Sequence, residues 1–155
     1  MPLHGGIVLG LDRLANIQKI DTENMIATAQ PGVVLIDFQN EVESNGLFYP
    51  PDLASLQWCT LGGNVAENAG GPRALKYGVT KDYVLGLRAI LPNGEIIETG
   101  KRTVKGVAGY DLTSLLCGSE GTLAVLTEIT FKLIPNTPEV KTAIVVFPSA
   151  QAAAQ

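Results

Sequence analysis

One stretch of the sequence has the composition of a surface that lies against a flat ligand. Residues 60–71 contain four glycines and two alanines among twelve positions. Because such small side chains let the backbone approach a ring closely, its exposed N–H groups can hold anionic or carbonyl oxygens. Asn64 and Asn68 add amide donors and acceptors that suit the edge of a heteroaromatic ring. The alternative is a mobile glycine-rich loop without a ligand, and composition alone leaves both interpretations open.

Two shorter motifs are candidates for the same surface. Residues 116–123 are expected to make a tight turn from a helix to a strand, and without a further signal this turn is only a connector. Residues 50–52, Pro-Pro-Asp, make a rigid segment that could form the wall of a ring pocket. The carboxylate of Asp52 adds a hydrogen-bond acceptor there. Each of these two motifs is a weak signal when taken alone.

Several other classes of protein are disfavoured by the sequence. With 11 basic and 15 acidic residues the net charge is −4, which argues against a nucleic-acid-binding protein. No G-x-G-x-x-G motif follows a strand, and residues 100–102 lack the spacing of a P-loop, which disfavours a Rossmann dehydrogenase and an NTPase. Because His4 is the single histidine, a multi-histidine site is impossible, and no metal site is expected. Cys59 and Cys117 match no zinc or redox spacing and are expected to be free thiols.

The elements that would position these motifs follow from the apolar pattern. Apolar runs predict strands over residues 6–11, 25–29, 82–91, 95–99, 123–134 and 141–147. Helices are predicted over residues 33–44 and 110–117 and from Ser149 onward. The rest reads as loops over residues 12–16, 60–83 with one helical turn at 64–68, and 100–109. No run approaches the roughly 20 apolar residues that span a bilayer.

The sequence also predicts where one hairpin turns, where the first helix ends and which side chains face the core. Residues 92–94, Pro-Asn-Gly, should close a hairpin between the strands at 82–91 and 95–99. Asn45-Gly46 should end the first helix. The predicted inward-facing residues are Leu35, Phe38, Val42, Leu112, Leu115, Leu116, Val125, Ile129, Phe131 and Leu133.

Taken in order, the motifs resemble one family, the FAD-linked oxidases of the vanillyl-alcohol oxidase / p-cresol methylhydroxylase type. The resemblance is carried by Pro31-Gly32-Val33, Pro50-Pro51-Asp52, residues 61–71, Lys76-Tyr77-Gly78, Gly109-Tyr110-Asp111-Leu112 and residues 118–123. This ordered set covers nearly the whole chain and is far more specific than a single glycine motif. Within the family, the chain is most similar to the group of glycolate oxidase flavin subunits and the related D-lactate and D-2-hydroxyglutarate dehydrogenases.

The resemblance implies non-covalently bound FAD and a set of residues that contact it. Those residues are Pro51, Asp52, Thr60, Gly62, Gly63, Asn64, Glu67, Asn68, Ala69, Gly70, Gly71, Tyr77, Gly78, Gly118, Ser119, Glu120, Gly121, Thr122, Leu123 and Ala124. Residues 118–124 would contact the adenosine end, and the backbone N–H groups of residues 62–64 would stabilise charge on the reduced ring. No catalytic residue is identified, because the family's base is expected in a separate cap domain.

The resemblance also implies an α+β fold, a mainly antiparallel sheet flanked by helices. Residues 1–32 would be a remnant of the first FAD subdomain, residues 33–136 the second FAD-binding subdomain, and residues 137–155 the start of a C-terminal cap domain. In the family a pyrophosphate loop precedes the segment that matches residues 2–6. We therefore expect a truncated domain that binds FAD weakly or not at all.

The implied activity is the oxidation of a 2-hydroxy acid of the glycolate or D-lactate type, with hydride transfer to flavin N5. Electrons would then pass to a quinone, a cytochrome or an iron–sulfur partner subunit. The expected location is the cytoplasm, with membrane association only through partners, and uncovered sheet edges also allow a homo-oligomer. The alternative from another class is a non-catalytic flavin-domain remnant that acts as an assembly or interaction module.

Overall fold

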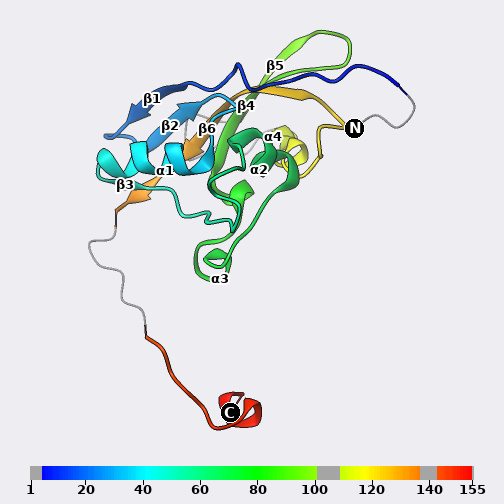
Figure 1. Ribbon diagram of the computed structural model, residues 1–155. Coiled ribbons are helices and arrows are strands. Elements are labelled where there is room, and N and C mark those ends of the chain that lie inside the picture. Colours follow the sequence, from blue (N-terminus) through cyan, green and yellow to red (C-terminus); the bar gives the residue numbers. More distant parts are fainter. Residues whose placement is uncertain (1–4, 101–108, 137–142, 155) are drawn as a thin grey trace.

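The computed structural model describes residues 5–100, 109–136 and 143–154, and its centre is a five-stranded antiparallel sheet (Figure 1). The strand order is β1 (Ile17–Asp21), β2 (Ile26–Ala29), β6 (Val125–Lys132), β4 (Val84–Ile90) and β5 (Ile96–Gly100). A separate antiparallel pair joins β3 (Leu47–Phe48) to β7 (Ile134–Pro135). The helices are α1 (Leu35–Ser44), α2 (Leu61–Glu67), α3 (Ala74–Tyr77), the 3-10 helix η1 (Thr80–Tyr83), α4 (Leu112–Leu116) and α5 (Ala150–Ala153). This architecture confirms the predicted α+β class with a mainly antiparallel sheet flanked by helices.

Helices α1 and α2 pack on one face of the sheet and make the core with it. The core contains apolar side chains from α1 and α2 together with those of β2, β4 and β6. The opposite face of the sheet is polar, since it presents Lys19, Thr28, Arg88 and Glu128 around an open hollow. None of the described helices is long and apolar enough to cross a membrane.

Helix α1 forms where the sequence predicts it, but it begins at Leu35 rather than at residue 33. Val34 is held in an extended conformation by a bridge to Thr60, which delays the first helical turn. Leu35, Phe38 and Val42 are fully buried, as their spacing predicts. The helix ends as predicted at Asn45, and Gly46 then adopts a positive φ of 74°.

The hairpin of β4 and β5 is confirmed, with its turn at Asn93-Gly94 and a φ of 86° at Gly94. Its first strand begins two residues later than predicted, because Thr80–Tyr83 form η1 instead. Strand β6 is also confirmed, but the prediction that Val125 faces the core is wrong. A bulge leaves Thr127 between the pairs Arg88↔Glu128 and Ala89↔Leu126, so Leu126 is buried in place of Val125.

Two predicted strands are absent. Residues 6–11 form no strand, and Ile7 is 95% exposed. Residues 143–147 are likewise without regular structure and expose Ile144 and Val146, while residues 141–142 lie outside the described part of the chain. An apolar run becomes a strand only when another strand pairs with it, and no strand of the described residues does so here. The helix predicted after Ser149 is present as α5, with Ser149 Oγ accepting a hydrogen bond from Ala152 N.

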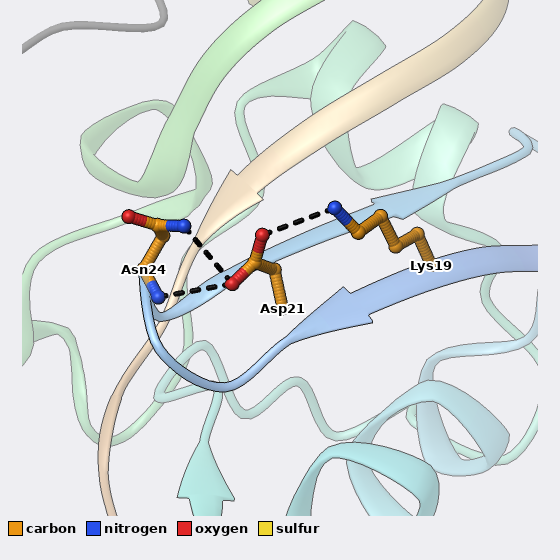
Figure 2. Close-up of polar contacts among 3 residues, drawn as sticks. All are labelled: Lys19, Asp21 and Asn24. Atoms are coloured by element: carbon orange, nitrogen blue, oxygen red, sulfur yellow. Dashed lines mark hydrogen bonds and ion pairs between the residues drawn. The ribbon is translucent and has the colours of Figure 1, made fainter.

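Strand β1, which the apolar pattern did not predict, pairs with β2 through a tight turn (Figure 2). In this turn Asp21 Oδ1 accepts hydrogen bonds from the backbone N and the side-chain Nδ2 of Asn24, at 3.0 and 3.1 Å. Lys19 Nζ lies 3.0 Å from Asp21 Oδ2. The Asn24 backbone bond, followed by the Lys19 and Asn24 side chains, lowers the pKa of Asp21 to about 2. Asp21 therefore remains charged and keeps the turn closed at neutral pH.

Helix α4 is shorter than predicted and turns a different face inward. It begins after Asp111, whose Oδ1 accepts a hydrogen bond from Ser114 N, and it buries Leu116 as expected. Leu112 and Leu115 were predicted to face the core, but they are 44% and 60% exposed. Thr113 is buried instead, and its hydroxyl donates to Thr99 Oγ1 at 2.9 Å. The loop predicted over 100–109 falls on residues 101–108, which lie outside the described ranges.

An aromatic cluster fills the core beneath the helices. Tyr49 is fully buried, and its ring contacts Phe38, Phe131 and Tyr83 at centroid distances of 5.1–5.8 Å. Tyr49 Oη makes no hydrogen bond of good geometry among the described residues, although the side chain of Thr80 lies near it. Burial is the dominant effect and raises the pKa of Tyr49 far above its usual value, and Thr80 offsets it only in part. By contrast, Tyr83 Oη donates to Tyr77 O at 2.7 Å. The two tyrosines therefore differ in whether their hydroxyls are satisfied.

We predict opposite effects of removing these two hydroxyls. Tyr49→Phe removes an unsatisfied buried polar group and should raise the free energy of unfolding by about 1 kcal/mol. Tyr83→Phe removes a hydrogen bond and should lower that free energy by about 1 kcal/mol. Urea unfolding of both variants measures the difference. If Tyr49→Phe is as destabilising as Tyr83→Phe, Tyr49 Oη makes a hydrogen bond in solution, for example with Thr80.

Candidate functional site

The glycine-rich stretch is mostly helical rather than the predicted loop. Residues 60–83 form α2, α3 and η1, and the first glycine pair lies in the first turn of α2. Thr60 caps this helix, because its Oγ1 accepts a hydrogen bond from Gly63 N at 3.4 Å. The helix ends at Asn68, which adopts the left-handed conformation. Capping at both ends helps this short helix with two glycines to form despite its low propensity.

Packing within the chain requires glycine at some positions of this stretch but not at others. A Cβ at Gly62 would lie 2.5 Å from Pro31 Cβ, and a Cβ at Gly71 would overlap the carbonyl of Asp52. At these two positions the chain's own packing requires glycine. Gly63 is exposed, and a Cβ there would meet only Thr60 Oγ1, at 3.5 Å. The bare backbone at Gly63 is therefore open to a group from outside the chain.

The turn at residues 118–121 lies against the C-terminal end of α2. Gly118 N donates to Val65 O at 2.9 Å, and Glu120 N donates to Ala66 O at 2.8 Å. These carbonyls are among those that a helix leaves without an internal partner at its C-terminus. Positive φ angles at Gly118, Glu120 and Gly121 give the turn its shape. The two motifs that are 50 residues apart in the sequence therefore form one continuous surface.

The Pro50–Asp52 segment adjoins this surface through two anchors. Gln39 of α1 donates from Nε2 to Pro51 O at 2.8 Å and to Tyr49 O at 3.3 Å. At the other end of the segment, Gly71 packs directly against the Asp52 backbone. The structure thus brings the three predicted motifs together. Tyr77 and Gly78 lie at the end of α3, where the Tyr77 ring meets that of Phe48.

The predicted residues differ in how much of them faces solvent. The exposed ones are Gly63, Glu67, Gly118, Glu120, Gly121, Thr122 and Leu123. Those half-buried are Asp52, Thr60, Gly62, Asn68, Ala69, Gly70, Gly71, Tyr77, Gly78 and Ser119. The buried ones are Pro51, Asn64 and Ala124. Ala124 belongs to the core cluster, so its side chain faces the protein interior.

The two asparagines of the glycine-rich stretch have different hydrogen-bonding. Asn68 Oδ1 accepts a hydrogen bond from Lys81 N at 3.0 Å, which ties α2 to η1. Asn64 is 3% exposed, and its Nδ2 has no hydrogen-bond partner among the described residues. Leaving a buried amide unpaired costs about 1–3 kcal/mol. An acceptor on a bound ligand would remove that cost, so Asn64 is the side chain that best indicates a binding role.

Two hollows on the described surface lie away from the predicted residues. One, of about 600 Å³, runs between β1 and α1, and the other, of about 680 Å³, lies on the polar face of the sheet. Neither is lined by any of the twenty predicted residues. The predicted site at α2, the 118–121 turn and the 50–52 segment is therefore separate from both hollows.

The cysteines play no chemical part in this arrangement. Both Cys59 and Cys117 are free thiols, as predicted. Cys117 is buried, and this burial raises its pKa to about 11. Its thiol therefore stays protonated at neutral pH and is a poor nucleophile. No cluster of metal-ligating side chains occurs in the described ranges.

Sequence reasoning missed two residues that support the site. Gln39 follows Leu35 by four positions on the inward face of α1, so a polar residue on an apolar face could have indicated its role. Arg73, which pairs with Asp52, lies in a segment without periodicity, and no sequence pattern pointed to it.

Comparison with known proteins identifies relatives over nearly the whole chain. A family described as "FAD binding domain" matches residues 2–100. The glycolate oxidase subunit GlcD of Bacillus subtilis (strain 168) is 53% identical over 154 residues, which cover 99% of this chain and 33% of that protein. The D-lactate dehydrogenase of Anaerostipes hadrus is 47% identical over 131 residues, covering 84% of this chain and 27% of that enzyme. The chain thus spans about a third or less of the length of the curated relatives it matches.

A solved structure has the same fold. An alkyldihydroxyacetonephosphate synthase superposes on 80% of this chain with a TM-score of 0.70 and 27% sequence identity. The matched region is 22% of that enzyme chain. The antiparallel sheet with its flanking helices is therefore shared with a larger protein.

We predict that the neighbouring glycines of α2 respond oppositely to alanine. Gly62→Ala places a Cβ against Pro31 and should lower the free energy of unfolding by about 1–3 kcal/mol. Gly63→Ala enters open space and should raise it by up to about 1 kcal/mol, because alanine favours the helix. Urea unfolding at constant m-value measures both, and each variant is the control for the other. Equal destabilisation by the two substitutions would contradict the open environment of Gly63.

Proposed function

Because the chain belongs to the FAD binding domain family, we propose that α2 and the 118–121 turn hold FAD in a flavin-dependent oxidoreductase that acts on a 2-hydroxy acid. The cofactor class follows from the family. The substrate class is supported by the names of two relatives, a glycolate oxidase subunit and a D-lactate dehydrogenase. The proposal for the site rests chiefly on the unpaired, buried Nδ2 of Asn64.

The residues present fit a flat, polar cofactor. Asn64 offers a donor that lacks a partner among the described residues, and Gly63 offers backbone with open space above it. Isoalloxazine and adenine rings both carry acceptor atoms at their edges, which matches an amide donor. A ring that lies on Gly63 would cover backbone that no side chain shields. We propose that FAD is held in this way without a covalent bond.

When bound, FAD supplies the acceptor for a hydride from the carbinol carbon of the substrate. The chain's own contribution is to bind and orient. The cap at Thr60 and the turn at Gly118 hold α2 at both ends. The backbone N–H groups expected to face the ring already donate within the chain, from Gly62 to Pro31 O and from Gly63 and Asn64 to Thr60, so Asn64 Nδ2 is the donor of this turn that is left for a ligand. Pro51, anchored by Gln39, forms a rigid wall. No described residue is assigned as the base that takes the hydroxyl proton.

We further propose that the protein works with a partner that receives electrons, either an iron–sulfur protein, a cytochrome or a quinone. One relative is named as a subunit, which supports an assembly of this kind. We propose a cytoplasmic location, with any membrane association mediated by the partner. The division at residues 32 and 136 into parts of two FAD subdomains and a cap is likewise a proposal.

Replacing Asn64 by an isosteric apolar residue should weaken FAD binding without lowering the free energy of unfolding. Asn64→Leu removes a buried unpaired amide, so we expect the free energy of unfolding to stay level or rise. The same change removes a donor to FAD, and the Kd for FAD should rise by about tenfold. Equilibrium titration with FAD to about 1 mM, followed by flavin fluorescence, measures Kd over the range that weak binding requires.

Two control variants accompany this test. Gln39→Leu removes a buried amide that has partners and should destabilise the fold, whereas Lys19→Ala, at the far edge of the sheet, should leave Kd unchanged. If Asn64→Leu leaves the Kd for FAD unchanged, Asn64 is not a cofactor ligand. If the unaltered chain shows no FAD binding up to about 1 mM, α2 and the 118–121 turn do not hold FAD in this chain by themselves.

A further inference from the structure

Arg73 makes two contacts that tie the proposed FAD surface together. Its Nε lies 3.1 Å from Asp52 Oδ2, and its guanidinium carbon lies 5.3 Å from the centroid of the Phe48 ring. The Arg73 and Asp52 side chains are 41% and 26% exposed, so the ion pair is partly shielded from water. Stacking on an aromatic ring while pairing with a carboxylate is a role that arginine fills better than lysine.

Both partners of Arg73 are themselves fixed in place. Phe48 is buried in β3, and its ring meets that of Tyr77 at a centroid distance of 6.0 Å. The backbone of Asp52 packs closely against Gly71. Arg73, which precedes the first residue of α3, therefore joins the start of that helix to residues 50–52. Loss of the pair would leave the Asp52 carboxylate free to turn toward a ligand.

The charge of Asp52 matters for the proposed cofactor. FAD carries negative phosphates, and its ring gains electron density on reduction, so an unpaired carboxylate beside it would oppose both binding and reduction. We infer that Arg73 is a positioning residue, an inference that rests on the proposed function. Arg73 pairs with Asp52, holds residues 50–52 in place and neutralises the negative charge of the Asp52 carboxylate beside FAD. Its action passes through Asp52 and needs no contact between Arg73 and the cofactor.

The test is a double-mutant cycle with Arg73→Gln, Asp52→Asn and the double variant, read by the Kd for FAD and by the midpoint potential of bound FAD. Arg73→Gln should raise Kd by about fivefold, which is the upper range for a partly exposed ion pair. The double variant should return Kd to within about twofold of the unaltered chain, because no unpaired carboxylate remains. Arg73→Gln should lower the midpoint potential and Asp52→Asn should raise it, since they leave opposite charges unpaired.

Arg88→Gln is the matched control, because Arg88 pairs with Glu98 at 3.8 Å on strands β4 and β5 and should leave the Kd for FAD unchanged. A purely structural arginine would weaken binding without rescue by Asp52→Asn and without opposite shifts in potential, and that result would overturn the inference. Equal Kd values in all variants would overturn it as well, while leaving the proposed function intact. If the unaltered chain fails to bind FAD, the proposed function fails first, and this inference fails with it.

Discussion

The contact between the C-terminal end of α2 and the 118–121 turn is the constraint on which the site depends. Two backbone hydrogen bonds, from Gly118 and Glu120 to the last carbonyls of α2, join segments that are distant in sequence. The bond from Glu120 satisfies Ala66 O near the helix end, whereas Val65 O also accepts a hydrogen bond from Asn68 N at 3.2 Å. The two bonds from the turn also fix the orientation of a seven-residue helix that has little intrinsic stability. The surface proposed for FAD exists because this junction forms.

Among the glycines and asparagines of residues 60–71, some are explained by contacts within the fold and others are not. Gly62 and Gly71 are small because Pro31 and Asp52 lie against them, whereas nothing in the described structure requires glycine at position 63. Likewise Asn68 links α2 to η1 through its Oδ1, while Asn64 Nδ2 is left without a partner among the described residues. Residues unexplained by the fold are where a ligand is most reasonably sought.

Much of the fold could be predicted from local patterns, and the errors have physical causes. Helix α1 and the β4–β5 hairpin follow from their periodicity and turn residues, since these signals are local. In β6 the bulge at Thr127 reverses which side chains face the core before it. Because the bulge depends on pairing with β4, the sequence of β6 alone could not predict it. Residues 6–11 have the composition of a strand but no partner strand among the described residues. For the site, composition located the stretches, but the helical state of α2 and the role of Arg73 depend on tertiary contacts.

The proposed position of FAD is the surface shared by α2 and the 118–121 turn. Nuclear magnetic resonance of the ¹⁵N-labelled chain during addition of FAD tests this position residue by residue. We expect the side-chain amide of Asn64 and the backbone amides of Gly63 and residues 118–121 to shift together and saturate with one Kd. Shifts confined instead to residues around the hollow on the polar sheet face, such as Thr28 and Glu128, would contradict it.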